Sequence, residues 1–134
     1  MGYAIGQPAL IKYLNDVKYS YNSYTMNYPS IKIGAAVIDD DEYFKKVLKN
    51  VVTTREWFAE EIKKMGFEVL PSSTNFVFAK HESKSGNDIF EALKAKGIFV
   101  RHFKQDRIDD YLRITIGTDE EMKAVVEFFK EYLG

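Results

Sequence analysis

A helical pattern from Asp41 to Met65 constrains this sequence more than any other feature. Apolar residues recur there at every third or fourth position, as they do on the buried face of an amphipathic helix. They are Phe44, Val47, Leu48, Val51, Phe58, Ile62 and Met65. Gly66 ends the pattern, and the chemistry then changes to that of β-strands. A helix with such a face must bury it against a second layer.

The residues that follow predict that second layer. Residues 67–70 and 75–80 favour two short strands around a Pro-Ser-Ser-Thr turn, and residues 98–103 and 111–116 favour two more. Ser85 is expected to cap a helix that closes at Gly97, and Thr118 with Glu121 is expected to form a capping box at the start of a last helix. The fold class predicted for residues 41–134 is α+β, with a small sheet of about four strands and helices on one face.

Residues 1–40 have a different character and resemble connecting material cut from something larger. "GYAIG" at residues 2–6 is typical of the tail of a strand, and a short helix is expected from Pro8. The polar, tyrosine-rich residues 18–25 predict a loop, after which Ser23 or Thr25 would cap a second helix that runs to about Asp39. We therefore expect a helical connecting segment before the α+β unit, with domains at 1–40 and 41–134.

Composition narrows the possible functions. The chain has 134 residues and a net charge of −1, so it carries no electrostatic signal for nucleic acid or an anionic membrane. It has no cysteine, and its two histidines lack the spacing of a metal site, so no metal is expected. No apolar run is long enough to cross a bilayer, and a cytoplasmic protein is expected.

Two arginines stand inside the third and fourth predicted strands. Alternation places Arg113 on one face with Tyr111 and Thr115, and Arg101 on one face with Phe99 and Phe103. From the residue types alone, these arginines are either solvated on the open face of the sheet or part of a cationic pocket. Such a pocket would bind phosphate or carboxylate, because arginine donates two parallel hydrogen bonds to these anions.

Five segments together carry a family resemblance over essentially the whole chain: "GYAIG", "YNSYT", "GFEVLPSSTNFVFAK", "GIFVRHF" and "YLRITIGT". They resemble the C-terminal part of fold-type I, pyridoxal-phosphate-dependent aminotransferases, most of all the histidinol-phosphate branch. The resemblance implies that Arg113 is the main residue binding the substrate anion and that Arg101 supports it. It also implies that Asn75 faces the substrate cleft, although an asparagine there could simply close the preceding turn.

The same resemblance has implications for the cofactor. It places Tyr21 and Asn22 near pyridoxal phosphate and the subunit interface, and the alternative is a polar loop with helix-capping residues. The Schiff-base lysine of the family lies in a Ser-Lys motif before the segment that matches "GYAIG". Ser83-Lys84 is the only Ser-Lys pair in this sequence, and it is expected to be a turn. No catalytic residue is therefore assigned, and this chain alone is expected to bind no cofactor and to be inactive.

The reaction implied for a full-length relative converts histidinol phosphate and 2-oxoglutarate into imidazole acetol phosphate and glutamate, within histidine biosynthesis. The expected partners are a small phosphorylated or carboxylated amine and a second copy of the chain, not nucleic acid or a membrane. Three alternatives stay open: part of an aromatic-amino-acid aminotransferase, part of a threonine-phosphate decarboxylase, or a non-catalytic binding module that kept this fold.

Overall fold

The computed structural model describes residues 2–134, and the chain forms two compact units that divide after Lys45. These units are groups of residues in contact within this chain and do not test domain boundaries. The domains expected at 1–40 and 41–134 therefore stay a prediction. Helix α3 (Asp41–Lys63) begins in the first unit and supplies its longer part to the second.

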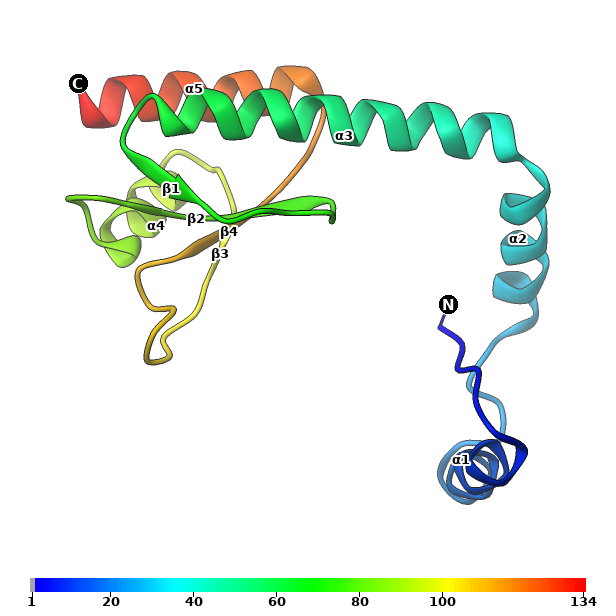
Figure 1. Cartoon of the computed structure of the whole chain (residues 1–134). Coiled ribbons are helices and arrows are strands. Elements are labelled where there is room, and N and C mark those ends of the chain that lie inside the picture. Colours follow the sequence, from blue (N-terminus) through cyan, green and yellow to red (C-terminus); the bar gives the residue numbers. More distant parts are fainter. Residues whose placement is uncertain (1) are drawn as a thin grey trace. The chain divides into compact units, whose positions relative to one another are not determined.

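The second unit is an antiparallel sheet covered by helices, which confirms the α+β prediction (Figure 1). Four strands lie in the order β1-β2-β4-β3: β1 (Phe67–Val69), β2 (Phe76–His81), β3 (Arg101–His102) and β4 (Leu112–Thr115). The helices are the later part of α3, α4 (Gly86–Ala95) and α5 (Asp119–Leu133). All pairs of neighbouring strands are antiparallel.

The core of this unit lies between one face of the sheet and the helices. In β2 and β4 the buried residues alternate with partly exposed ones, as expected for a sheet covered on one side. Val77, Ala79, Leu112 and Ile114 face the core. The helices contribute a larger set: Phe58 and Ile62; Ile89 and Leu93; and Met122, Val125, Val126, Phe128 and Phe129. On the other face of the sheet, residues such as Phe76, Phe78 and Arg113 are partly exposed.

Local signals at the helix ends confirm three predictions. The Ser85 side chain accepts a hydrogen bond from the Asp88 amide and caps α4. Thr118 and Glu121 form a reciprocal capping box at the start of α5. Gly66 follows α3 with a φ of +85°, a left-handed conformation that glycine adopts without steric cost.

The third strand is shorter than the predicted 98–103, since only Arg101 and His102 are strand residues. The reason lies at the end of α4. Gly97 turns the chain with a φ of +78°, and the Ile98 amide then donates to the Leu93 carbonyl of the helix. Residues 98–100 are thus held to the helix end before the chain enters the sheet.

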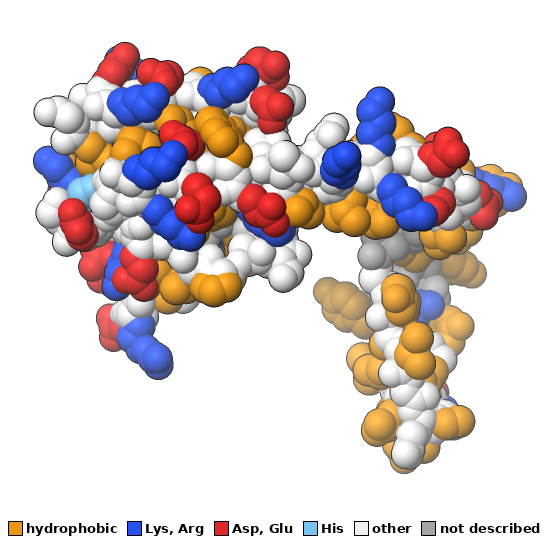
Figure 2. Space-filling model, turned by 45° about the horizontal axis from the view of Figure 1, so that its top comes forward, with side chains coloured by type: hydrophobic (Ala, Val, Ile, Leu, Met, Phe, Trp, Pro, Cys, Tyr) orange, Lys and Arg blue, Asp and Glu red, His pale blue; other side chains and the backbone are white. Residues whose placement is uncertain are grey.

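The first unit holds helices α1 (Pro8–Tyr21) and α2 (Tyr28–Asp39), and neither contains a buried residue. Many of their apolar side chains are exposed, among them Leu10, Tyr13, Val17, Ile33 and Ile38, and Figure 2 shows this hydrophobic surface. Proline stands in the first turn of each helix, as expected. None of the described helices is long and apolar enough to cross a membrane.

Three local predictions in this unit are wrong. Residues 18–21 continue α1 instead of forming a loop, because no glycine or proline interrupts the helix before Asn22 ends it. Asn27, not Ser23 or Thr25, caps α2 by accepting from the Ser30 amide; Ser23 instead donates to the Tyr19 carbonyl. Residues 2–6 form no strand, since no described strand pairs with them.

Candidate functional site

The two arginines singled out in the sequence meet on the open face of the sheet. Arg101 of β3 and Arg113 of β4 are directly opposite in the antiparallel register. Leu112 and Ile114, which flank Arg113 in β4, are buried in the core, so Arg113 points away from it. Residues directly opposite in such a pair have Cβ atoms roughly 4.5–5.5 Å apart. The register thus brings the two guanidinium groups to one place.

Aromatic rings surround the two guanidinium groups. The Cζ atom of Arg113 lies 5.4 Å from the centre of the Phe76 ring and 5.9 Å from that of Phe103. The Cζ atom of Arg101 lies 5.3 Å from the same Phe103 ring. Cations at this distance from a ring are attracted by its negative face. Phe103 is therefore shared by both arginines.

Neither arginine has an acidic partner. Among residues 2–134, no carboxylate lies within the 4.0 Å salt-bridge distance of Arg101 or Arg113. The Nε atom of half-buried Arg113 is itself buried and has no hydrogen-bond partner in the same part of the chain. Buried donors are nearly always paired, so this unpaired group indicates a place for an acceptor. Two guanidinium groups can bind the two edges of one anion.

A carboxylate does stand on the same sheet face, but it is already neutralised. Glu68 of β1 forms an ion pair with Lys80 of β2 at 3.1 Å and accepts a hydrogen bond from the Tyr111 hydroxyl at 3.1 Å. The bond from Lys80, followed by that from Tyr111, lowers the pKa of Glu68, and the bond to Glu68 raises the pKa of Lys80. This cluster leaves no free charge to compete for the arginines.

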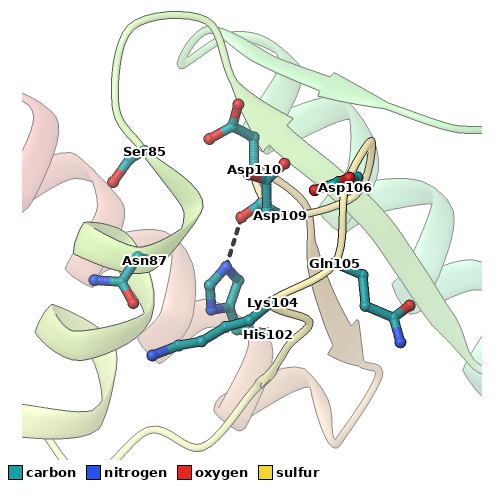
Figure 3. A pocket seen from close by; sticks show the side chains of 8 residues that line it. All are labelled: Ser85, Asn87, His102, Lys104, Gln105, Asp106, Asp109 and Asp110. Atoms are coloured by element: carbon teal, nitrogen blue, oxygen red, sulfur yellow. Dashed lines mark hydrogen bonds between the residues drawn. The ribbon is translucent and has the colours of Figure 1, made fainter.

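A polar pocket of about 420 Å³ lies on the β3–β4 loop (Figure 3). His102 Nε2 is hydrogen-bonded to the Asp109 carbonyl there, and the carboxylates of Asp106, Asp109 and Asp110 help to line the pocket. Neither arginine lines it. The three carboxylates disfavour the binding of an anion, so this pocket is not assigned to the anion site.

Asn75 lies immediately before β2. Its carbonyl accepts a hydrogen bond from the Ile116 amide at 2.9 Å. Ile116 directly follows β4, so the Asn75 backbone lies beside the end of the strand that carries Arg113. The side chain is exposed and forms no hydrogen bond within residues 2–134. The turn before it is closed by Ser72 and Thr74 instead, whose hydroxyls both donate to the Phe76 carbonyl. A role for Asn75 in binding stays a prediction.

Sequence reasoning missed two residues of this site, Phe76 and Phe103. Strand alternation does put Phe103 on the same face as Arg101, so part of the signal was present. Phe76 pairs with Thr115, which is the next residue after Arg113 on that face of β4. Only the pairing of strands distant in sequence could show that both rings reach the Arg113 guanidinium.

The family model of class I and II aminotransferases matches residues 1–129. The chain belongs to this family. It is 47% identical over 133 residues to the histidinol-phosphate aminotransferase of Lactococcus lactis subsp. cremoris, which confirms the resemblance recognised in the sequence. That match covers 99% of this chain but only 37% of the relative, so the chain spans little more than a third of the relative's length.

Solved structures agree with the fold. An aminotransferase structure from Erwinia carotovora atroseptica matches 98% of this chain with a TM-score of 0.85 at 23% identity, and the match covers 36% of that structure. The histidinol-phosphate aminotransferase of Sinorhizobium meliloti, solved in complex with pyridoxal-5'-phosphate, matches 83% of this chain and 32% of its own, with a TM-score of 0.72 and 24% identity. The fold is thus that of a part of an aminotransferase.

Pyridoxal phosphate is the cofactor of this family. Tyr21, predicted to lie near it, is 94% exposed at the end of α1. Asn22 follows as the C-cap, and its side-chain oxygen already accepts the Tyr24 amide. These two residues do not by themselves form a cradle that fits the cofactor, and their predicted role stays untested.

Lys84 has no place at the anion site. It lies in the bend between β2 and α4, where its amide donates to His81 Nδ1, and its Nζ atom is 5.7 Å from the Tyr132 ring of α5. The predicted turn at Ser83-Lys84 is confirmed. Lys84 thus belongs to the surface near the C-terminal helix.

Proposed function

We propose that this chain supplies the anion clamp of an aminotransferase that acts on histidinol phosphate. The observation that supports the proposal most is the cross-strand pair of Arg101 and Arg113, which has no carboxylate partner within residues 2–134. A phosphate ester carries roughly −1.5 to −2 charges at neutral pH and can satisfy two arginines at once. The 47% identical relative from Lactococcus lactis bears the name of this activity.

In this proposal Arg113 binds the substrate phosphate most strongly, because its guanidinium is half-buried and its Nε lacks a partner. Arg101 is more exposed and adds a second point of attachment. Asn75, beside the end of β4, would contact a more distant part of the substrate. The clamp holds the substrate in one orientation. It thereby removes translational and rotational freedom that would otherwise slow the transfer of the amino group.

Calorimetric titration of the chain with histidinol phosphate, and with histidinol as the ligand lacking the phosphate, tests the clamp. Changing Arg113→Gln is expected to weaken the binding of histidinol phosphate by about tenfold or more, and Arg101→Gln by about threefold, as loss of charge-assisted hydrogen bonds predicts. Lys123→Gln removes the same charge from an exposed position on α5 and is the control. Equal affinity of Arg113→Gln and the wild-type chain would show that the clamp is assigned wrongly.

We further propose that this chain alone does not transaminate. Its only Ser-Lys pair, Ser83-Lys84, lies in a surface bend apart from the arginines. Incubation with pyridoxal phosphate, histidinol phosphate and 2-oxoglutarate should therefore yield no glutamate. Borohydride reduction of the mixture with pyridoxal phosphate, followed by peptide mapping, would detect a lysine that binds the cofactor. An adduct at one specific lysine would contradict this proposal.

The proposal includes self-association through the first unit. Helices α1 and α2 bury none of their residues, and side chains such as Ile38, 79% exposed, and Val17, 67% exposed, leave a large apolar surface in water. A second copy of the chain can cover part of this surface. Sedimentation velocity over a range of concentrations should show dimers or larger species, whereas a stable monomer at high concentration would contradict the proposal.

A further inference from the structure

One aromatic ring lies against both guanidinium groups. Arg101 and Arg113 are directly opposite on neighbouring strands, where two like charges repel one another. No carboxylate of residues 2–134 lies within salt-bridge distance to offset the repulsion. The Phe103 ring is 5.3 Å from the Cζ atom of Arg101 and 5.9 Å from that of Arg113. Its negative face attracts both cations.

The sheet holds this ring in place. Phe103 is half-buried and is the first residue after β3. It meets Phe78 of β2 edge to face, with ring centres 6.4 Å apart and planes at 70°. Phe78 in turn stacks on Tyr111 at 4.7 Å, and the Tyr111 hydroxyl is fixed by Glu68. The row Phe103–Phe78–Tyr111 thus forms a continuous aromatic support across the open face.

The geometry points to Phe103 as a positioning residue that keeps the two guanidinium groups side by side, so that the site prefers a dianionic phosphate to a carboxylate. This inference rests on the proposed clamp and goes beyond it. It assigns the preference for a dianion to the attraction between the Phe103 ring and the two guanidinium groups. A monoanion needs only Arg113, whereas a dianion gains from both arginines. Removing the attraction of the ring should therefore affect the dianion more.

The test compares methyl phosphate, a dianion at pH 8, with acetate, both titrated into the full chain and followed by NMR. Changing Phe103→Leu should weaken methyl phosphate binding about fivefold and leave acetate binding within about twofold, given the strength of cation–π attraction. Phe99→Leu is the matched control, since Phe99 is 81% exposed and lies beside neither guanidinium. Phe103→Tyr keeps the ring face and should restore the preference for the dianion.

Replacing Phe103 with 3,4,5-trifluorophenylalanine separates electronics from packing. The fluorinated ring keeps nearly the same shape but loses most of the negative charge on its face, so the preference for methyl phosphate should fall about threefold with little change in thermal unfolding. This variant also decides the matter if Phe103→Leu does not fold. An unchanged ratio of the two affinities with the fluorinated ring overturns the inference.

The same titrations distinguish failure of this inference from failure of the clamp. If Arg113→Gln weakens methyl phosphate binding but the fluorinated ring does not, the clamp stands and Phe103 is only a packing residue. If Arg113→Gln binds methyl phosphate as well as the wild-type chain does, the clamp itself is wrong, and the inference about Phe103 falls with it.

Discussion

The two units of this chain contain equally regular helices but differ in what those helices bury. Helix α5 buries five residues in the core of residues 46–134, whereas α1 and α2 bury none. All three begin with recognisable local signals, a capping box in α5 and an early proline in α1 and α2. Local signals therefore define where a helix begins, while the contribution of the helix to stability depends on what covers its apolar side.

The largest contrast is expected from removing one leucine in each unit. Leu93 of α4 is fully buried, and Leu14 of α1 is 56% exposed. Changing Leu93→Ala should lower the free energy of unfolding by about 2–5 kcal/mol because it leaves a cavity. At protein concentrations low enough to keep the chain monomeric, Leu14→Ala should change it by no more than about 0.5 kcal/mol.

Urea unfolding followed by the fluorescence of Trp57, the only tryptophan, measures the free energy of unfolding of the second unit. Trp57 lies in the part of α3 that belongs to the second unit. A large effect of Leu14→Ala on this transition would show that α1 is covered in solution, in line with the proposed self-association. Dilution of the protein would then reduce that effect.

A glycine in each unit gives the next contrast. A Cβ atom on Gly86, at the start of α4, would lie 2.7 Å from the backbone carbonyl of Asp110, whereas one on Gly6 would meet only the Ile11 side chain at 3.7 Å. Gly86→Ala should therefore cost about 1–3 kcal/mol through overpacking. The added methyl group of Gly86→Ala would push the β3–β4 loop away from α4. Gly6→Ala should leave the free energy of unfolding almost unchanged. A neutral Gly86→Ala in the same unfolding assay would mean that this loop shifts freely.

Helix caps give a smaller contrast. Thr118→Ala removes the capping box of α5 and should destabilise the second unit by about 1 kcal/mol. Asn27→Ala removes the bond from the Ser30 amide that caps α2 and should leave the Trp57 transition unchanged. Circular dichroism would show its effect instead as a loss of helix. If both variants shift the Trp57 transition equally, the two units unfold together.

The smallest effect concerns pH and the cluster of Glu68, Lys80 and Tyr111. The pKa of Glu68 is lowered in the folded chain, first by the bond from Lys80, so its contribution to stability is present above the ordinary value of 4.5 and is lost as the pH falls through the lower folded value. Because Glu68 is exposed, the change should be small. Comparing Glu68→Gln with the wild-type chain between pH 7 and 3 measures it: the difference should shrink toward pH 3, and a constant difference would contradict the assignment.

Much of the fold could be predicted because its signals are local. The caps of Ser85 and Thr118 and the turn at Gly66 lie within a few residues of the groups they serve. The errors arose where a local signal had competitors. Ser23 could cap a helix, but it donates to the Tyr19 carbonyl of the helix before it. Residues 98–100 have strand composition, but the bond between Ile98 and Leu93 keeps them at the end of α4.

The site was predictable only in part, for a similar reason. The period of two residues along a strand determines that Arg113 and Leu112 face opposite ways, and the sequence by itself indicates this. That Arg101 lies opposite Arg113 and that both meet the Phe103 ring follows from the pairing of β3 with β4, which no local pattern indicates. Register joins residues far apart in the chain, and a shift of one position would turn one arginine to the other face. Two ordinary arginines become a site through that pairing.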